Sequence, residues 1–408
     1  MMRLPLTPLL LGLLVAHLFN PHATAKPNAR PSPAKNNSQP ADNTETLRIG
    51  YLGQQPATPP VQPFFDPIIT DAGIQGARLG ITDDNTTGRF TRQNFILTER
   101  VLAPDQDIGT AFRQLIADGH HHILVNLPAS ALGSLTLLAE SQSALIYDIA
   151  SRDDALRGED CRANVLHMLP NRAMRADALA QYLAKKRWKK WLLVRGPDQA
   201  DALYAEALRR SARKFGSKIV ADKLWEHHFD ERRTPESEIP VFTQGDDYDV
   251  VVVADESGLF GDFLPYRTWE ARPVAGTAGL IPTSWHPTLE AWGALQLQNR
   301  FREQTTRWMT EIDYGAWLAV RAIGEAATRS HSAQFDHVKA YLLGKDFSLA
   351  GFKGVPLSFR PWDHQLRQPV LLANDRSLVA TAPIEGYLHP QNELDTLGFD
   401  AAESHCRF

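Results

Sequence analysis

The part of the sequence that indicates the fold class most firmly is Val250-Val251-Val252-Val253-Ala254-Asp255-Glu256. Four consecutive β-branched residues favour an extended backbone. Apolar side chains at every position, rather than at alternate positions, indicate a strand that is buried on both faces. The segment therefore predicts a central strand of a parallel sheet that helices cover on both sides, with a loop beginning at Asp255.

Strand and helix signals alternate along the chain on both sides of this segment. Short apolar runs predict strands at 47–52, 77–82, 122–125, 144–147, 191–194, 219–221 and 273–276. Helical spacing of apolar residues predicts helices at 108–118, 132–140, 172–186, 199–215 and 314–328. Such alternation predicts an α/β protein with doubly wound parallel sheets. A chain of this length is expected to form two domains of ordinary size.

Parallel sheets bind ligands at the carboxyl ends of their strands. The loops at those ends follow Leu52, Val125, Tyr147, Val194, Ala254 and Gly276. Nearby aromatic side chains would suit a planar ligand, although packing in the core is the alternative interpretation for each. These aromatic residues are Tyr51, Tyr204, Phe260, Trp269, Trp285 and Trp292.

Carboxylates also follow several expected strands. Asp148 and the pair Asp255-Glu256 take such positions, and so does the pair Asp83-Asp84. Hard cations prefer converging carboxylate oxygens, so Asp148, Asp255 and Glu256 are candidate metal ligands. The alternative is that these groups cap loops or form ion pairs at a hinge.

Two histidine clusters are further metal candidates. Residues 120–122 are three histidines before an expected strand, and consecutive strand residues point to opposite faces. A polar turn is therefore the preferred interpretation there. His227 and His228 precede Asp230 in a polar stretch that also suits a solvated loop.

The sequence carries no recognisable catalytic signature. It has no glycine-rich phosphate loop, no metalloprotease helix motif and no nucleophile elbow. The formal net charge of −4 gives no general affinity for nucleic acid or an anionic membrane. We expect a binding protein rather than an enzyme, and an enzyme on the same fold is the alternative.

The N-terminal segment has the features of a secretory signal. Arg3 precedes an apolar run at 9–18, and Ala23-Thr24-Ala25 is a small-x-small cleavage site. The run is too short to span a bilayer, so residues 1–25 are expected to be a cleaved signal peptide, with an uncleaved anchor as the alternative. Residues 26–46 are rich in Pro, Asn, Ser and Ala and predict a flexible leader, with order beginning at Leu47.

The two cysteines of the chain are Cys161 and Cys406. Export to an oxidising compartment predicts that they form a disulfide, with two free thiols as the alternative.

Several segments, in order and spacing, resemble the type I periplasmic substrate-binding proteins of ABC transporters, in particular the branched-chain amino-acid type. The segments are 72–79, which looks like the entry to that family's second strand, 146–151, 314–327 and 351–359. A further set is similar to the subfamily associated with PQQ-dependent alcohol dehydrogenase systems. It comprises 84–90, 264–269, 283–286 and 366–369.

The resemblance implies positions for the ligand contacts. The position of the family carboxylate that holds an amino acid's ammonium group falls at Ala278, so a free α-amino acid is not expected unless Asp255 or Glu256 takes that role. The expected ligand-binding residues are Tyr51, Leu127, Pro128, Ala129, Asp148, Ile149, Ala150, Ser151, Tyr204, Asp255, Glu256 and Ala278.

The resemblance also implies two lobes joined by crossovers near residues 169, 286 and 366. Lobe 1 would comprise 47–168 and 287–366, and lobe 2 would comprise 169–286 and 367–408. Ligand would bind between the lobes and close them by hinge bending.

The implied function is the periplasmic solute-binding component of an ABC transport system linked to PQQ-dependent alcohol oxidation, with a membrane permease as partner. No cofactor is required, and PQQ, calcium, a lanthanide or an alcohol-derived metabolite are compatible ligands. The alternative is an accessory or sensor protein that binds one of these ions or PQQ for a periplasmic quinoprotein dehydrogenase.

Overall fold

The computed structural model describes residues 44–56, 68–226 and 234–408. The expected signal peptide, most of the expected leader and the cluster around His227 and His228 lie outside these residues. Within the described segments, no helix has both the length and the apolar character that crossing a membrane requires. The first strand begins at Glu45, two residues before the expected start of order at Leu47.

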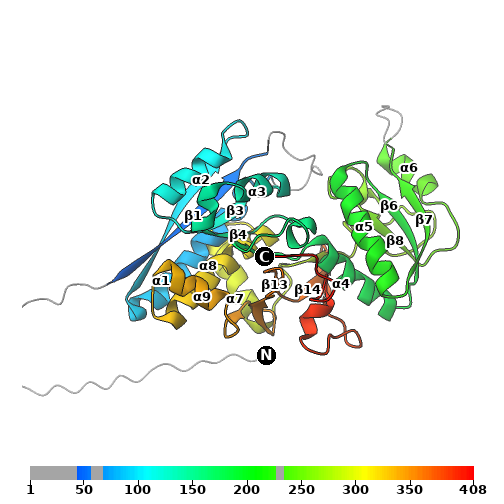
Figure 1. Cartoon of the computed structure of the whole chain (residues 1–408). Coiled ribbons are helices and arrows are strands. Elements are labelled where there is room, and N and C mark those ends of the chain that lie inside the picture. Colours follow the sequence, from blue (N-terminus) through cyan, green and yellow to red (C-terminus); the bar gives the residue numbers. More distant parts are fainter. Residues whose placement is uncertain (1–43, 57–67, 227–233) are drawn as a thin grey trace, which may run out of the picture. The chain divides into compact units, whose positions relative to one another are not determined.

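The first lobe is defined as a five-stranded parallel sheet with the helices that pack on it (Figure 1). Its strand order is β2-β1-β3-β4-β5. The strands are β1 (Glu45–Gln54), β2 (Gln93–Leu102), β3 (His122–Asn126), β4 (Leu145–Asp148) and β5 (Val165–His167). The helices are α1 (Ile74–Thr91), α2 (Ile108–Ala117), α3 (Ala129–Thr136), α7 (Ala294–Thr305), α8 (Glu311–Ser330) and α9 (Phe335–Leu342).

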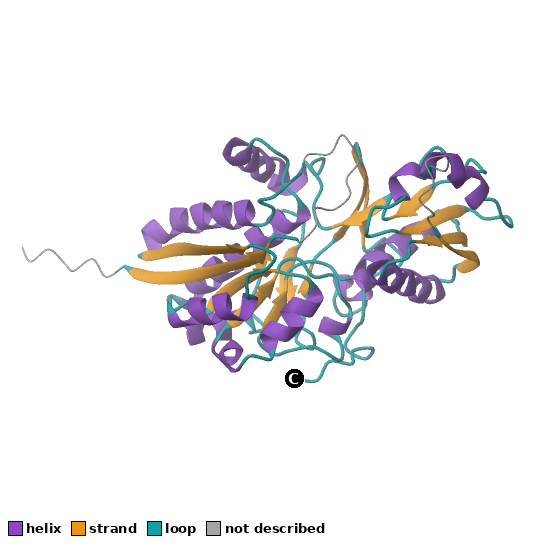
Figure 2. Cartoon of the chain, turned by 90° about the horizontal axis from the view of Figure 1, so that it is seen from above, coloured by secondary structure: helices purple, strands orange, loops and turns teal. Residues whose placement is uncertain are grey.

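The two faces of this sheet pack against different helices, as the alternation of strand side chains requires. Leu47, Ile49 and Tyr51 share one core with residues of α1, α7 and α8. Leu52 points to the opposite face and packs with residues of α2 and α3. Figure 2 shows helices on both sides of the strands. Helices therefore cover both faces of this sheet.

The strand expected at 77–82 is wrong, because these residues lie within α1. The alternation of Ala77, Leu79 and Ile81 imitates a strand, but residues at a spacing of four are buried. Gly76 and Gly80 lie on this stripe and face α8. The resemblance of 72–79 to the entry of a second strand fails for the same reason, and the second strand is β2.

The second lobe is a four-stranded parallel sheet with its covering elements. The strand order is β7-β6-β8-β9. The strands are β6 (Lys190–Arg195), β7 (Lys218–Leu224), β8 (Val250–Ala254) and β9 (Val274–Gly276). α4 (Arg172–Lys185) and α5 (Gln199–Lys214) pack on one face, and α6 (Pro235–Phe242) packs on the other. All five residues of β8 are buried in this central position, which confirms the interpretation of the valine run.

Short antiparallel strands accompany the two parallel sheets. One sheet has the order β10-β14-β15, and the other has the order β11-β12-β13. These strands are β10 (Ile281–Thr283), β11 (Leu349–Ala350), β12 (Pro356–Phe359), β13 (Leu366–Arg367), β14 (Val370–Asn374) and β15 (Ser377–Ala382). The 3-10 helices are η1 (Ala139–Ser143), η2 (Ala155–Arg157), η3 (Gly261–Phe263), η4 (Ala291–Gly293) and η5 (Glu393–Thr396). The lobe boundaries expected from the sequence stay a prediction.

Two buried glutamines tie neighbouring chain segments between the lobes. The Gln365 amide donates to the carbonyl oxygens of His167 and Leu169, and the Gln368 amide donates to Met168. Both side chains are inaccessible to solvent, so these bonds compensate polar groups that would otherwise be buried without partners.

The two histidines that flank His121 are buried, so a polar turn is wrong for both. His120 contacts the Leu115 carbonyl and the Thr98 hydroxyl through its two ring nitrogens. His122 begins β3 and contacts the Tyr147 hydroxyl. Burial lowers the pKa of His122 to about 3, so this ring is neutral at pH 7.

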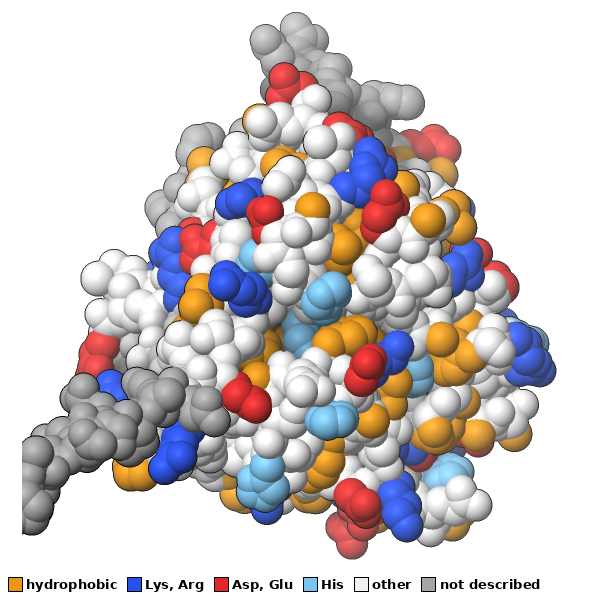
Figure 3. Space-filling model, turned by 60° about the vertical axis from the view of Figure 1, so that its left-hand side comes forward, with side chains coloured by type: hydrophobic (Ala, Val, Ile, Leu, Met, Phe, Trp, Pro, Cys, Tyr) orange, Lys and Arg blue, Asp and Glu red, His pale blue; other side chains and the backbone are white. Residues whose placement is uncertain are grey.

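Figure 3 shows the side of the molecule that carries the first lobe, where acidic and basic side chains are interspersed.

The expected disulfide between Cys161 and Cys406 is confirmed. It joins residues that are 245 positions apart and holds the C-terminal tail against the loop before β5. A cross-link over so long a loop restricts the unfolded chain strongly.

Replacing both cysteines with serine should lower the free energy of unfolding by about 2–5 kcal/mol, because the unfolded chain regains the conformations that the cross-link removes. Urea denaturation of the variant and the oxidised wild type measures the difference. Equal midpoints would show that the disulfide does not stabilise the fold.

Gly76→Ala should destabilise the protein by about 1–3 kcal/mol or more, because overpacking forces helices apart. A Cβ atom at residue 76 would lie 1.8 Å from the Asp313 carbonyl oxygen of α8. Gly133→Ala is the matched control, since a Cβ there meets nothing within 4 Å and helix propensity favours alanine. Thermal unfolding of the two variants should shift in opposite directions, and similar losses in both would contradict the α1–α8 contact.

Candidate functional site

A cavity of about 580 Å³ lies at the carboxyl ends of β1, β3 and β4. Residues of the second lobe complete its lining. The lining residues are Gln54, Gln55, Pro56, Pro104, Asn126, Leu127, Pro128, Ala129, Ala150, Ser151, Arg152, Asp153, Arg172 and Glu256. The position agrees with the rule that parallel sheets bind ligands where their strands end.

Six of the expected ligand-binding residues line this cavity. They are Leu127, Pro128, Ala129, Ala150, Ser151 and Glu256. Pro128 precedes α3, whose first turn has no side-chain cap. The backbone N–H groups of a helix start lack intrahelical acceptors, so α3 presents donors at the cavity wall.

Tyr51 and Ile149 are expected contacts that are buried instead of lining the cavity. The Tyr51 hydroxyl donates to the Ala72 carbonyl and accepts from the Asn126 amide, both at 3.1 Å. Burial raises the pKa of Tyr51, so its hydroxyl keeps the proton that it donates. Tyr51 thus supports Asn126, which does line the cavity.

Asp148 is an expected contact that serves the loop after β4. One carboxylate oxygen accepts from the Ser151 N–H at 2.8 Å, and the other lies 2.9 Å from His167 and 3.6 Å from Arg157. Burial acts to raise the pKa of Asp148, but His167 and Arg157 outweigh it and hold that pKa below its usual range. The side chain shapes the wall without facing the cavity.

Asp255 stabilises the loop after β8 through hydrogen bonds, as Asp148 does for the loop after β4. Its two oxygens accept from the backbone N–H groups of Leu259, Phe260 and Gly261 at 2.6–3.0 Å. Ala278 is buried beside this loop. Glu256, the next residue, accepts from the Arg172 guanidinium at 2.6 Å.

Asp148, Asp255 and Glu256 therefore all accept hydrogen bonds from protein donors. Across 44–56, 68–226 and 234–408, no group of three or more His, Cys, Asp or Glu side chains could hold a metal ion. The alternative interpretation, in which these carboxylates cap loops and form ion pairs, describes their contacts.

The sequence interpretation missed Glu311, a charged residue that contacts the cavity-lining Arg152 but does not itself line the cavity. Glu311 lies in the first turn of α8 and forms ion pairs with Arg152 and Arg175. It also accepts from the Thr283 hydroxyl at 3.0 Å and from the Ser284 N–H at 3.3 Å. The capping box Thr310-x-x-Asp313 could have indicated the helix start three residues before the expected one.

Electrostatics keep Glu311 charged although it is largely buried. Desolvation acts to raise the pKa of Glu311, but the coulombic attraction of Arg152 and Arg175 outweighs it and holds that pKa well below the ordinary value of 4.5. Arg175 belongs to α4 of the second lobe, and its guanidinium also donates to the Pro170 and Pro282 carbonyls. Glu311 thus links both lobes and the chain segment after β10.

Tyr204 lies near the same charges. Its hydroxyl is buried and has no hydrogen-bond partner among the described residues. Burial raises the pKa of Tyr204, and this expected contact does not line the cavity.

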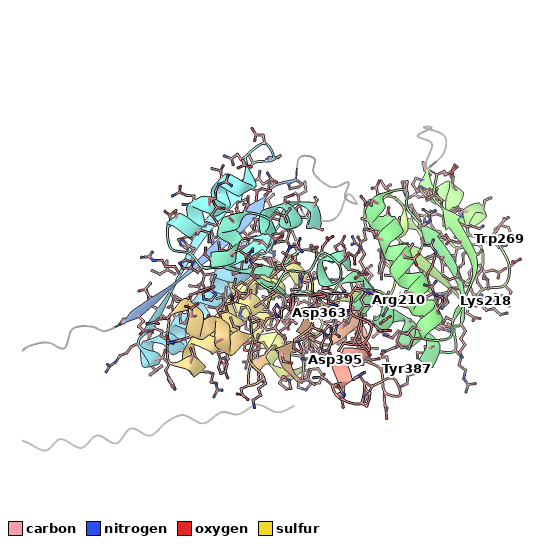
Figure 4. All side chains as sticks on the ribbon, viewed as in Figure 1. Arg210, Lys218, Trp269, Asp363, Tyr387 and Asp395 are labelled. Atoms are coloured by element: carbon pink, nitrogen blue, oxygen red, sulfur yellow. A yellow bond between two sulfur atoms is a disulfide. The ribbon has the colours of Figure 1, made fainter. Side chains whose placement is uncertain are left out.

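Two of the other aromatic candidates pack in cores, and two are exposed. Trp285 stacks on Tyr314 at 4.5 Å between ring centroids, and Phe260 stacks on Trp225 at 4.9 Å. Trp269 lies at the far edge of the second lobe (Figure 4) and is 58% exposed, as is Trp292. None of these four candidates lines the cavity.

Glu311→Gln should cost the protein more stability at pH 7 than at pH 4. The pKa of Glu311 is lower in the folded protein than in the unfolded chain, where it is near 4.5. The stability that the charged Glu311 contributes is therefore fully present well above pH 4.5. It is lost as the pH falls below that value. Urea denaturation of wild type and variant across this range measures the gap. A gap that widens toward low pH would contradict the assigned ion pairs.

Similarity to known proteins extends over the sheets that build this cavity. Residues 103–226 match the family model described as periplasmic binding protein. No curated protein matches the sequence. Many solved structures do match the fold.

Three solved structures, each with no more than 16% sequence identity, illustrate the likeness. A branched-chain amino acid ABC transporter periplasmic ligand-binding protein from Burkholderia xenovorans is 16% identical with a TM-score of 0.67, covering 88% of this chain and 99% of its own. An ABC transporter solute-binding protein from Rhodopseudomonas palustris, in complex with benzoate, is 11% identical with a TM-score of 0.63, covering 89% and 100%. A leucine-, isoleucine-, valine-, threonine- and alanine-binding protein from Brucella ovis is 14% identical with a TM-score of 0.61, covering 84% and 93%. The chain therefore has the α/β fold of type I periplasmic binding proteins, with parallel sheets in two lobes.

Proposed function

We propose that this chain, which has the type I periplasmic binding protein fold, is the solute-binding component of an ABC transport system in the periplasm. It binds a small molecule in the cavity at the carboxyl ends of β1, β3 and β4 and delivers it to a membrane permease. In this role the protein binds its ligand more tightly in one arrangement of the lobes than in the other, and it makes no covalent bond.

The observation that carries the proposal is the composition of the cavity wall. Leu127 and Ser151 come from loops of the first lobe, whereas Arg172 and Glu256 come from the second. A ligand that contacts both sets of residues ties the lobes together, and such binding favours a closed arrangement. The volume of about 580 Å³ is that of an ordinary small-molecule site.

Solved structures with the same fold support the proposal that the ligand is a small organic molecule. Their structures include complexes with benzoate, with 3,4-dihydroxybenzoic acid and with leucine. The proposal extends this class of ligand to the present chain.

The finer part of the proposal is a link to PQQ-dependent alcohol oxidation, which rests on the resemblance of the sequence motifs. PQQ carries carboxylates, and the arginines at the cavity suit such groups. Calcium or a lanthanide would instead need carboxylates that now accept hydrogen bonds from the protein, so PQQ is the better candidate. An accessory role beside a quinoprotein dehydrogenase would use the same cavity.

Binding in this cavity is tested by filling it. Ala150→Trp places an indole in the cavity, so ligands that raise the melting temperature of the wild type should no longer do so for the variant. Thermal-shift assays would use benzoate, 3,4-dihydroxybenzoate, leucine, PQQ, calcium and lanthanum. Ala402→Trp at an exposed turn is the matched control and should respond like the wild type.

Two results would contradict the proposal. One is the absence of a shift with every compound for the wild type. The other is an unchanged shift in Ala150→Trp, which would place binding elsewhere.

A further inference from the structure

We propose that the ligand of this cavity carries a carboxylate and no ammonium group, and that Arg152 determines this preference by donating to the carboxylate. The inference rests on the proposed solute-binding function and names the chemical class of the solute. It assigns Arg152 a role that differs from those of the two neighbouring arginines.

The first observation concerns the two acidic residues that line the cavity, Asp153 and Glu256. Both oxygens of Glu256 accept from the Arg172 guanidinium, at distances of 2.6–3.2 Å. One carboxylate oxygen of Asp153 lies 3.4 Å from the Arg172 Nη1 atom. The other oxygen accepts a hydrogen bond from the Ala155 N–H. Arg172 already compensates the charge of both residues, so an ammonium group placed beside them would meet a guanidinium of the same charge, which is unfavourable.

The second observation concerns the unused donors of Arg152. Its Nη2 atom contacts Glu311, and neither Nε nor Nη1 has a partner among the described residues. The side chain lines the cavity and is 36% exposed. An arginine has five N–H donors in a fixed fork, so Arg152 can bind Glu311 and a ligand carboxylate together.

In the two neighbouring arginines, every guanidinium nitrogen already has a partner. Arg172 uses Nε, Nη1 and Nη2 on Glu256 and Asp153, and its side chain is 10% exposed. Arg175 uses Nε, Nη1 and Nη2 on Pro170, Pro282 and Glu311, and it does not line the cavity. Among the arginines that line the cavity, Arg152 thus differs in having nitrogens, Nε and Nη1, without a partner among the described residues.

Unpartnered nitrogens of Arg152, beside carboxylates that Arg172 neutralises, fit an organic acid. They do not fit an α-amino acid, because its ammonium group would find no uncompensated carboxylate among the residues that line the cavity.

The test uses ligand pairs that differ in one group. Benzoate and benzamide differ in the negative charge, and α-ketoisocaproate and leucine differ in the amino group. Calorimetry on the wild type should show that each carboxylate without an amino group binds at least tenfold more tightly than its counterpart. This factor corresponds to one charge-assisted hydrogen bond.

The variants then test Arg152 itself. Arg152→Met should weaken carboxylate binding about tenfold to a hundredfold and leave benzamide unchanged. Arg152→Lys keeps a cation beside Glu311 and should restore part of the affinity, which guards against loss of fold in the methionine variant. Arg113→Met on the surface of α2 is the matched control and should bind like the wild type.

The outcomes separate the two proposals. Tighter binding of leucine than of α-ketoisocaproate, or full carboxylate affinity in Arg152→Met, would overturn the inference while solute binding stands. If no carboxylate, amide or amino acid binds the wild type, the proposed function itself fails.

Discussion

The buried carboxylate of Glu311 is the constraint on which the arrangement of this site depends. A charge removed from water is costly unless partners compensate it, and here guanidinium groups of Arg152 and Arg175 do so. Arg152 follows β4 of the first lobe, and Arg175 belongs to α4 of the second. Because Glu311 also accepts from Thr283 and Ser284, one side chain joins both lobes and the chain segment between them. Movement of the lobes must keep or exchange these partners.

The pairing of acidic groups within the fold also supports the ligand class that we propose for the cavity. Asp148, Asp255 and Glu256 appear in the sequence as free acidic groups at strand ends, but the fold supplies donors to each of them. Asp148 and Asp255 fix loops, and Glu256 neutralises Arg172. The cavity wall presents a guanidinium edge and the start of α3, both of which donate hydrogen bonds. These donors suit acceptor groups, as the proposed carboxylate ligand requires.

The sequence predicted the parallel sheets because their strands carry unbroken apolar runs, of which β8 is the strongest. The sequence-based prediction failed at α1, where small residues and alternating apolar residues imitate the pattern of a strand. It also missed β2, because polar residues interrupt the apolar pattern of that strand. The disulfide followed from cysteine count and export. The loops 127–129 and 150–151 line the cavity as expected, because they follow central strands.

Glu311 and Arg172 could not be predicted in the same way. Their importance arises from ion pairs between residues far apart in the sequence, such as Arg152 and Glu311, which lie 159 positions apart. Local patterns carry no information on such pairs. For the same reason the sequence overestimated Tyr51, Ile149 and Ala278, which sit close to the right loops but point into the cores.

The most direct test of the site is a crystal structure of the protein with α-ketoisocaproate or benzoate. We expect ligand density in the cavity after β1, β3 and β4, with the carboxylate within hydrogen-bond distance of the Arg152 guanidinium and residues of both lobes in contact. An empty cavity with the ligand bound elsewhere, or a carboxylate turned away from Arg152, would contradict the assigned site.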